Sequence, residues 1–461
     1  MKNTNPLLVP DLREMLAAGD TKTLQDFCRS GHPVVIADFI STLSQEEAWS
    51  VLQHVEPALR AEIFSHLDED LQVEVVRSLS RGEIAELLTE MPPDDRADLF
   101  KRLPEDLQEA ILPALAQAER EDIRRLSAYR EGTAGAVMTS DYATLSPQMT
   151  AAEAIEHLRK VAPDKETIYY AYVVDEHRKL LGFVSLKDLI LARRDARVGD
   201  IMHREVIFAR VDDDQEDAAR KIQKYDLIAL PVLNSNDALV GIITHDDAID
   251  IITQENTEDM EKLMAIAGSH EPGVYLKTSS WVHFKNRAYW IVGLAALGLV
   301  SGIIIHNFET TLMQMIILAF YMPMVADTGG NVGSQSATVV VRALALREIS
   351  PRDIFKVLWK EFKIAVMLAL VLGILSWGKV MFLSQGTEIP TGYSLAKIGA
   401  TIAIALALQV VTATLIGALL PLAVARMKMD PAVVASPALT TIVDITGLLI
   451  YFSTARLLLG I

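Results

Sequence analysis

The sequence predicts a multidomain membrane protein with an N-terminal α-helical superhelix, a tandem α/β pair, a connecting helix and an all-α transmembrane domain of five helices. Two observations predict this fold class. First, charge is segregated along the 461 residues: acidic residues outnumber basic ones 52 to 30 in residues 1–280, whereas basic residues outnumber acidic ones 13 to 8 in residues 281–461. Second, the acidic part contains two different internal repeats, and the remainder contains long apolar runs.

Composition excludes several classes of protein. A nucleic-acid binder would need a basic face, which the acidic first part lacks. Cys28 is the single cysteine, so a disulfide framework is excluded. The opening residues MKNTNPLLVPDLREM contain no apolar core of a secretory signal, and we expect none. The sequence has no P-loop and no GxSxG motif, so we do not expect an enzyme.

Residues 1–133 are predicted to form an acidic domain of helical repeats. An apolar residue recurs every twelve positions, and polar helix-start residues follow it, as in LDEDL, MPPDD and LPEDL. Proline at a first helical position and early Asp or Glu suit a helix N-terminus. The pattern therefore predicts short stacked helices, a small solenoid. The recurring residues are Leu67, Leu79, Met91, Leu103 and Leu115.

Residues 134–254 contain one unit twice, at about 134–197 and 198–254. VMTSDYATLSPQMTAAEAIEHL is similar to IMHREVIFARVDDDQEDAARKI, and each unit predicts strand, helix, strand, strand, helix. The segment resembles a tandem cystathionine-β-synthase (CBS) pair, which implies sensing of an adenine nucleotide such as ATP. In that family a Gly, two apolar residues, Ser or Thr, and an Asp three residues later can hold a ribose; GFVSLKD and GIITHDD match. The candidate nucleotide-binding residues are Asp188, Tyr170 and Lys187; the alternative is a pair that binds nothing.

Residues 255–280 are predicted to form a connecting helix and linker. The stretch QENTEDMEKLMAIAG predicts an amphipathic helix that begins at Asn256 or Thr257 and ends near Gly268. Pro272 and Gly273 then interrupt the chain. A helix between a sensor and a membrane domain can transmit a mechanical signal; the alternative is a charged spacer.

Five apolar stretches follow, at residues 288–306, 312–341, 363–383, 395–425 and 436–460. Each supplies the ~20 residues that a spanning helix needs, and helices satisfy their own backbone in lipid. Lys and Arg concentrate before the first stretch, between the second and third, and between the fourth and fifth. We therefore expect cytoplasmic N-terminal domains and an extracytoplasmic C-terminus in a multi-pass protein of the cell inner (plasma) membrane.

Two acids, Asp327 and Asp444, lie within these stretches. A carboxylate in lipid is costly unless it faces water, a cation or a partner. No Lys or Arg shares the depth of Asp444, which favours a mobile cation; the alternative is hydrogen bonding to neighbouring helices. In MPMVADTGGNVGSQSA, Pro323 and the glycines predict a broken or tightly packed helix, and Asn331 at depth indicates part of an ion path. The alternative is a kinked packing helix.

The order of these parts resembles the MgtE family of magnesium channels and transporters. The motifs are PMVADTGGNVGSQSATVVVRAL and LPLAVARMKMDPAVVASPALTTIVDITGLLIYF. The resemblance implies a homodimer with a pore on its two-fold axis, in which Asp444 binds hydrated Mg²⁺. It also implies pore roles for Asn331 and for backbone oxygens near Thr440 and Ser436. Asp327 has no counterpart role in the family. Mg²⁺ keeps several waters and needs few carboxylates, in agreement with such a site.

The resemblance further implies that regulatory Mg²⁺ binds between the helical domain, the CBS pair, the connecting helix and the loop before the last helix. Acidic faces would repel one another when Mg²⁺ is scarce, and bound ions would draw the connecting helix against the pore when it is abundant. The matching acids are Asp94, Asp95, Asp214, Glu216, Asp226, Asp247, Asp250, Glu255, Glu258, Asp259 and Asp430.

The predicted function is therefore a Mg²⁺-selective channel or transporter that passes Mg²⁺ inward down its electrochemical gradient and is closed by cytosolic Mg²⁺. One alternative is transport of another divalent cation such as Co²⁺ or Zn²⁺, although softer metals prefer His and Cys ligands. Another is a membrane-anchored nucleotide sensor that transports nothing.

Overall fold

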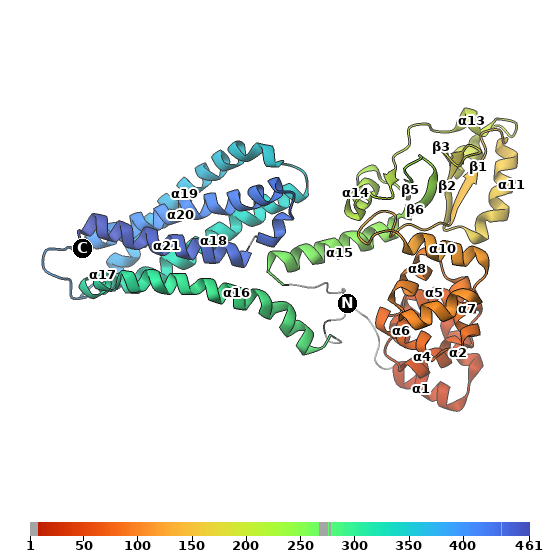
Figure 1. Ribbon diagram of the computed structural model, residues 1–461, viewed down its shortest axis with the longest axis horizontal. Coiled ribbons are helices and arrows are strands. Elements are labelled where there is room, and N and C mark those ends of the chain that lie inside the picture. The colour runs from red at the N-terminus through yellow and green to blue at the C-terminus, as the bar shows by residue number, and fades with distance from the viewer. Residues whose placement is uncertain (1–7, 267–274, 276–277, 435) are drawn as a thin grey trace. The chain divides into compact units, whose positions relative to one another are not determined.

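The computed structural model describes residues 8–266, 275, 278–434 and 436–461. The chain divides into two compact units, residues 1–253 and residues 254–461 (Figure 1). The first unit holds short helices and two three-stranded sheets. The second holds long helices, and the predicted combination of helical domain, α/β pair and helical membrane domain is confirmed.

The N-terminal helices repeat every twelve residues over a longer stretch than the predicted run. From α2 to α10 each helix begins twelve residues after the previous one. Leu79, Met91 and Leu103 are the residues at which α6, α7 and α8 end. The helices are α1 Leu8–Ala18, α2 Thr21–Ser30, α3 Pro33–Ile40, α4 Gln45–Leu52, α5 Pro57–Ser65, α6 Glu69–Ser78, α7 Arg81–Glu90, α8 Pro93–Arg102, α9 Glu105–Ile111, η1 Leu112–Ala114 and α10 Gln117–Ser127.

In four of these helices, α5, α6, α8 and α9, one side chain links the helix to the preceding repeat. Arg60, Gln72, Arg96 and Gln108 each occupy the fourth position of their helix. Each donates to a carbonyl oxygen at or just beyond the end of the preceding helix, at 2.7 to 3.2 Å. The last carbonyls of a helix have no partner within it, so these bonds satisfy them and fix each helix on its predecessor.

The CBS pair has the predicted order of strands and helices in both halves. In each three-stranded sheet the first two strands pair in parallel and the last two antiparallel. The first half comprises β1 Tyr142–Leu145, α11 Ala151–Val161, η2 Ala162–Asp164, β2 Thr167–Val174, β3 Leu180–Ser185 and α12 Leu186–Leu191. The second comprises α13 Val198–Ile201, β4 Ala209–Arg210, α14 Gln215–Tyr225, β5 Ala229–Leu233, β6 Leu239–Thr244 and α15 His245–Leu263.

The connecting helix is not a separate element, which corrects the sequence-based expectation. α15 begins at His245, directly after β6, and passes through Asn256 and Thr257 without interruption. No Gly or Pro lies between His245 and Leu263, so nothing stops the helix where a cap was expected. It ends at Leu263, and Gly268, Pro272 and Gly273 lie outside the described residues.

The second unit is built on five long helices, α16, α18, α19, α20 and α21. Four of them, α16, α19, α20 and α21, are long and apolar enough to cross a membrane by length and composition. α18 has the length, at 29 residues, but its polar residues and glycines make it less apolar. The elements are α16 Ser280–Asn307, α17 Glu309–Gln314, α18 Ile317–Ala345, η3 Pro351–Asp353, α19 Ile354–Leu383, α20 Leu395–Arg426, η4 Pro431–Val434 and α21 Ser436–Leu459.

α18 packs closely against both α20 and α21. A Cβ atom on Gly417 of α20 would lie 2.3 Å from the Gly333 carbonyl oxygen of α18, so these two backbones touch. α18 also continues through Pro323 without a break. Of the two structures that the sequence left open for this segment, the tightly packed helix is the one observed.

A candidate cation cleft

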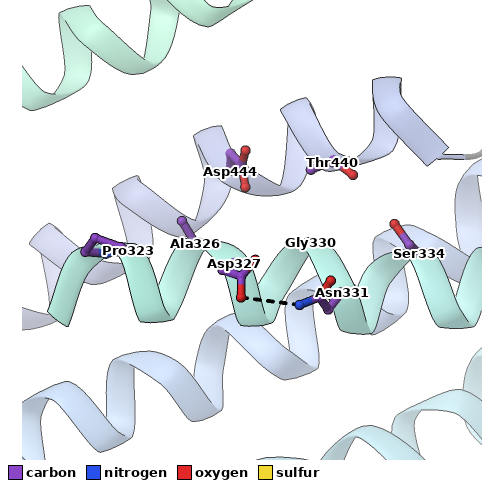
Figure 2. A pocket seen from close by; sticks show the side chains of 8 residues that line it. All are labelled: Pro323, Ala326, Asp327, Gly330, Asn331, Ser334, Thr440 and Asp444. Atoms are coloured by element: carbon purple, nitrogen blue, oxygen red, sulfur yellow. Dashed lines mark hydrogen bonds between the residues drawn. The ribbon is translucent and has the colours of Figure 1, made fainter.

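A cleft of about 550 Å³ lies between α18 and α21 (Figure 2). Of its lining residues two are acidic and none is basic. Six come from α18 and two from α21, so these two helices form it. The lining residues are Pro323, Ala326, Asp327, Gly330, Asn331, Ser334, Thr440 and Asp444.

Helical spacing explains why these residues share one face. Asp327, Asn331 and Ser334 follow one another at intervals of four and three, which places them on one side of α18. Thr440 and Asp444 are four residues apart on α21. Figure 2 shows two levels: Asp327 and Asp444 lie at one, and Asn331 and Thr440 lie about a turn further along the cleft. The cleft therefore has a carboxylate level and a neutral oxygen level.

Hydrogen bonding and charge act together at these levels. The Asn331 Nδ2 atom donates to the Asp327 Oδ2 atom at 3.4 Å, so the two levels are linked along α18. The charges of Asp327 and Asp444 are close enough to repel each other. The repulsion between the two carboxylates favours a cation in the cleft, because a cation relieves it and accepts oxygen ligands.

Small residues and one buried amide position Asp444. A Cβ atom on Gly330 would lie 3.2 Å from the Thr440 Cγ2 atom, so the glycine brings α18 against α21. Gln409 of α20 is fully buried, and its Nε2 atom donates to the Val443 carbonyl oxygen at 2.8 Å. This bond holds the backbone one residue before Asp444. The spacing of polar residues in the sequence contained no signal for Gln409.

The structure brings together three of the four predicted pore residues, Asp444, Asn331 and Thr440. The side chain of Ser436 lies outside the part of the chain that the structure describes. Asp327, which the resemblance left without a role, joins the same cleft. Its place four residues before Asn331, on the same helical face, was the available signal.

A second acidic group lies in the first unit. Asp94 and Asp95 lie in the first turn of α8, and Asp247 lies in the first turn of α15. Their charges influence one another and that of Glu166. Burial and the charges of Asp95, Asp247 and Glu166 raise the pKa of Asp94 above its usual value. Burial is also the main cause that raises the pKa of Asp247 to about 6. Glu166 keeps an exposed surface, and partial loss of water together with the charge of Asp247 raises its pKa to about 7. Glu166, just before β2, was missed by sequence reasoning.

Other predicted regulatory acids are separated or already engaged. Asp214 caps the start of α14, where it accepts from the Glu216 backbone N–H at 2.9 Å, and Glu216 pairs with Arg220. Asp226 directly follows the same helix, roughly 18 Å from Asp214 at the helical rise per residue. The structure therefore does not bring Asp226 together with Asp214. Asp250 lies a turn along α15 from Asp247, and burial raises its pKa.

In the second unit a lysine joins two predicted acids. The Lys262 Nζ atom lies 2.7 Å from the Glu258 Oε1 atom and 2.9 Å from the Asp430 Oδ2 atom. Burial lowers the pKa of Lys262, but its hydrogen bonds to both carboxylates outweigh this and raise it. The end of α15 is thereby tied to the loop before α21, and Leu263 packs beside Val341 there. Glu255 and Asp259 lie on the same helix.

The candidate nucleotide residues lie around β2, β3 and α12. The Ser185 Oγ atom donates to the Asp188 Oδ2 atom at 2.5 Å, and the His203 Nε2 atom lies 3.1 Å from the same oxygen. Tyr170 packs edge-on against Phe183, on which the His203 ring stacks. Lys187 is exposed in the first turn of α12. His203 is an addition that the repeat pattern did not indicate.

Within the described residues, no three His, Cys, Asp or Glu side chains converge closely enough to hold a bare metal ion.

Comparison with known proteins supports this organisation. The family model described as a divalent cation transporter matches residues 322–454, the MgtE intracellular N domain matches 31–132, and the CBS domain matches 134–195 and 198–254. The magnesium transporter MgtE of Thermus thermophilus is 38% identical over 98% of both chains. That of Bacillus subtilis is 36% identical over 73% of this chain and 72% of its own.

Two solved structures resemble the soluble part. The cytosolic domain of the Mg²⁺ channel MgtE in complex with ATP matches with a TM-score of 0.50 and 38% identity, over 53% of this chain and all of that one. The soluble part of a magnesium transporter matches with a TM-score of 0.51 and 32% identity, over 54% of this chain and 97% of that one. These matches define a membrane transporter of divalent cations that carries CBS domains. The chain belongs to the MgtE family of magnesium transporters.

Proposed function

We propose that this chain is a channel that passes Mg²⁺ through the cleft between α18 and α21. The observation that carries the proposal is the polar face of α18. Asp327 and Asn331 are exposed on this helix and face Asp444 across the cleft. Inside a bilayer such a face has to meet water, an ion or another protein surface, because lipid leaves it unsatisfied.

The ligand chemistry favours a hard, hydrated cation. The polar lining groups are carboxylate, amide and hydroxyl oxygens, and neither His nor Cys lines the cleft. Co²⁺ and Zn²⁺ bind more readily to imidazole and thiolate ligands. Mg²⁺ with its waters fits a cleft of this size and charge better than a softer metal does.

Two copies of the chain would complete the pore. A two-fold axis along the exposed face of α18 would set two Asp444 side chains opposite each other, with hydrated Mg²⁺ between them. The Lys and Arg distribution then puts the N-terminal domains in the cytoplasm and the C-terminus outside. Influx follows the electrochemical gradient.

Cytosolic Mg²⁺ would close this channel. The acids of the first unit, Asp94, Asp95, Asp247 and Glu166, are charged at neutral pH only at a cost, and bound Mg²⁺ removes that cost. On α15, Mg²⁺ at Glu255, Glu258, Asp259 and Asp430 would hold the connecting helix against the membrane domain. Asp214, Glu216, Asp226 and Asp250 are proposed as further ligands. The closed state would bind Mg²⁺ more tightly than the open state, so Mg²⁺ would shift the population of channels toward the closed state.

ATP binding at the CBS pair would tune this response. The support is the relative whose cytosolic domain was solved with ATP. In this proposal Asp188 would hold the ribose, Tyr170 would stack on the base and Lys187 would meet the phosphates. His203 shares the Asp188 carboxylate and so belongs to the same region.

The test of the transport proposal is Mg²⁺ uptake into liposomes that contain the full-length D444N variant. We expect uptake to be lost while the variant elutes and unfolds like the parent, since only the carboxylate charge is removed. The control is E388Q, which removes an exposed acid outside the cleft. Unchanged uptake in D444N would contradict the proposal and favour the alternative hypothesis of a nucleotide sensor that transports nothing. Equal or faster Co²⁺ uptake by the parent would favour the other divalent specificity.

A further inference from the structure

The proposed function counts Asp327 in the polar face of α18 but gives its charge no role of its own. Asp327 lies on α18, a turn before Asn331, and it lines the same cleft as Asp444. A carboxylate inside the bilayer has a high free-energy cost, so such residues are rare unless they have a function. The position of Asp327 therefore calls for a physical explanation.

The geometry places the two carboxylates of one chain at the same level. Gly330 brings α18 against α21 beside Thr440 and Asp444, and Asp327 precedes Gly330 by one turn. Figure 2 shows Asp327 and Asp444 side by side across the cleft, with Asn331 and Thr440 at the next level. A cation that reaches Asp444 is thus also beside Asp327.

The Asn331 hydrogen bond keeps the Asp327 side chain along the cleft wall. Asn331 donates through Nδ2, so one oxygen of Asp327 is occupied at 3.4 Å. An Asn at position 327 could accept the same hydrogen bond through its amide oxygen. The effect of the negative charge can therefore be separated from the effect of the contact.

We propose that Asp327 is a specificity-determining residue of the cation cleft, where its charge adds to that of Asp444 and sets both the affinity for Mg²⁺ and the preference for divalent over monovalent cations. This inference rests on the proposed function. A second carboxylate doubles the charge that one chain presents at this level. The attraction of a divalent ion to this carboxylate is twice that of Na⁺ or K⁺, because Coulomb energy scales with ionic charge.

The test uses purified full-length protein in liposomes with D327N, D327E, D444N and the control E388Q. The readouts are the half-saturating Mg²⁺ concentration and the ratio of Mg²⁺ to Na⁺ permeability from reversal potentials. In D327N we expect the half-saturating concentration to rise by about tenfold, as for loss of one unit charge near a divalent ion, and the permeability ratio to fall. D327E should restore both, and E388Q should change neither.

The outcomes separate this inference from the function on which it rests. If D327N matches E388Q in both readouts while D444N is inactive, the Asp327 inference is overturned and Mg²⁺ conduction stands. If D327N lowers the maximal rate alone and D327E fails to restore it, Asp327 is a packing residue and the inference is also overturned. Unchanged transport in D444N would instead overturn the proposed function.

Discussion

At the scale of single residues, glycines set the distances on which the cleft depends. Gly417 and Gly333 allow backbone contact between α20 and α18, and Gly330 allows α18 to reach α21 beside Asp444. An added Cβ at Gly417 would meet the backbone of α18, and one at Gly330 would meet the Thr440 side chain at 3.2 Å. The cleft geometry is therefore sensitive to single methyl groups.

Gly417→Ala is expected to disturb this packing. The added Cβ would lie 2.3 Å from the Gly333 carbonyl oxygen, and overpacking of this kind costs about 1–3 kcal/mol. We expect a lower apparent Tm in detergent together with slower Mg²⁺ uptake. Gly378→Ala is the matched control, because nothing lies within 4 Å of its added Cβ. Equal Tm and uptake in the two variants would contradict the packing argument.

At the scale of elements, α15 links the two units as one uninterrupted helix. Its first turn contains Asp247, and its last turn contains Lys262, which contacts Glu258 and Asp430. The Lys262 ammonium group occupies the position between two carboxylates that a bridging cation would otherwise take.

Lys262→Met should loosen the end of α15 when Mg²⁺ is scarce. Glu258 and Asp430 would then repel each other, so flux at low cytosolic Mg²⁺ should rise, while high Mg²⁺ should still inhibit.

Neutralising the acids instead, in E258Q/D259N/D430N, should leave flux that persists at high Mg²⁺. The measurement is Mg²⁺ current in patches with cytosolic Mg²⁺ varied, and Lys360→Met is the control. Inhibition that is the same in the triple variant as in the parent would rule out bridging.

At the scale of the whole molecule, acidity is concentrated in the part that would sense Mg²⁺. Residues 1–280 carry the large acidic excess, and a few of these carboxylates are gathered between α8, β2 and α15. Most other acids lie on exposed faces, where water solvates them. Folding therefore brings these carboxylates together at an electrostatic free-energy cost, which bound protons or cations can remove.

This cost predicts how stability depends on pH. The pKa of Asp247 is raised from 3.8 to about 6 in the folded chain, so its charged form disfavours folding. Below about pH 4 it is protonated in both states and has no effect; as the pH rises through about 6, stability is lost. Calorimetry of the metal-free full chain should show a smaller loss in D247N, and Mg²⁺ should raise the Tm more at pH 7.5 than at pH 5. A Tm difference between parent and D247N that does not vary with pH would contradict this.

The sequence was sufficient for much of the fold, because its repeats are periodic. The twelve-residue pattern around Met91 predicted where helices begin, and the repeat containing Gly182 and Gly241 predicted the two α/β halves. It was wrong about the start of the connecting helix, since capping residues such as Asn256 do not end a helix that nothing interrupts. The domain boundaries and the roles of the individual site residues stay predictions.

Local order along the chain was thus available from the amino acids alone: apolar spans, short helices, an acidic N-terminal part, and carboxylates at positions 327 and 444 within the apolar spans. Proximity between distant segments was not, because hydrophobic periodicity says which face of a helix is buried and not which helix covers it. Only the packed structure placed Asp327 opposite Asp444, Gln409 behind Val443, Glu166 beside Asp94 and Lys262 between Glu258 and Asp430.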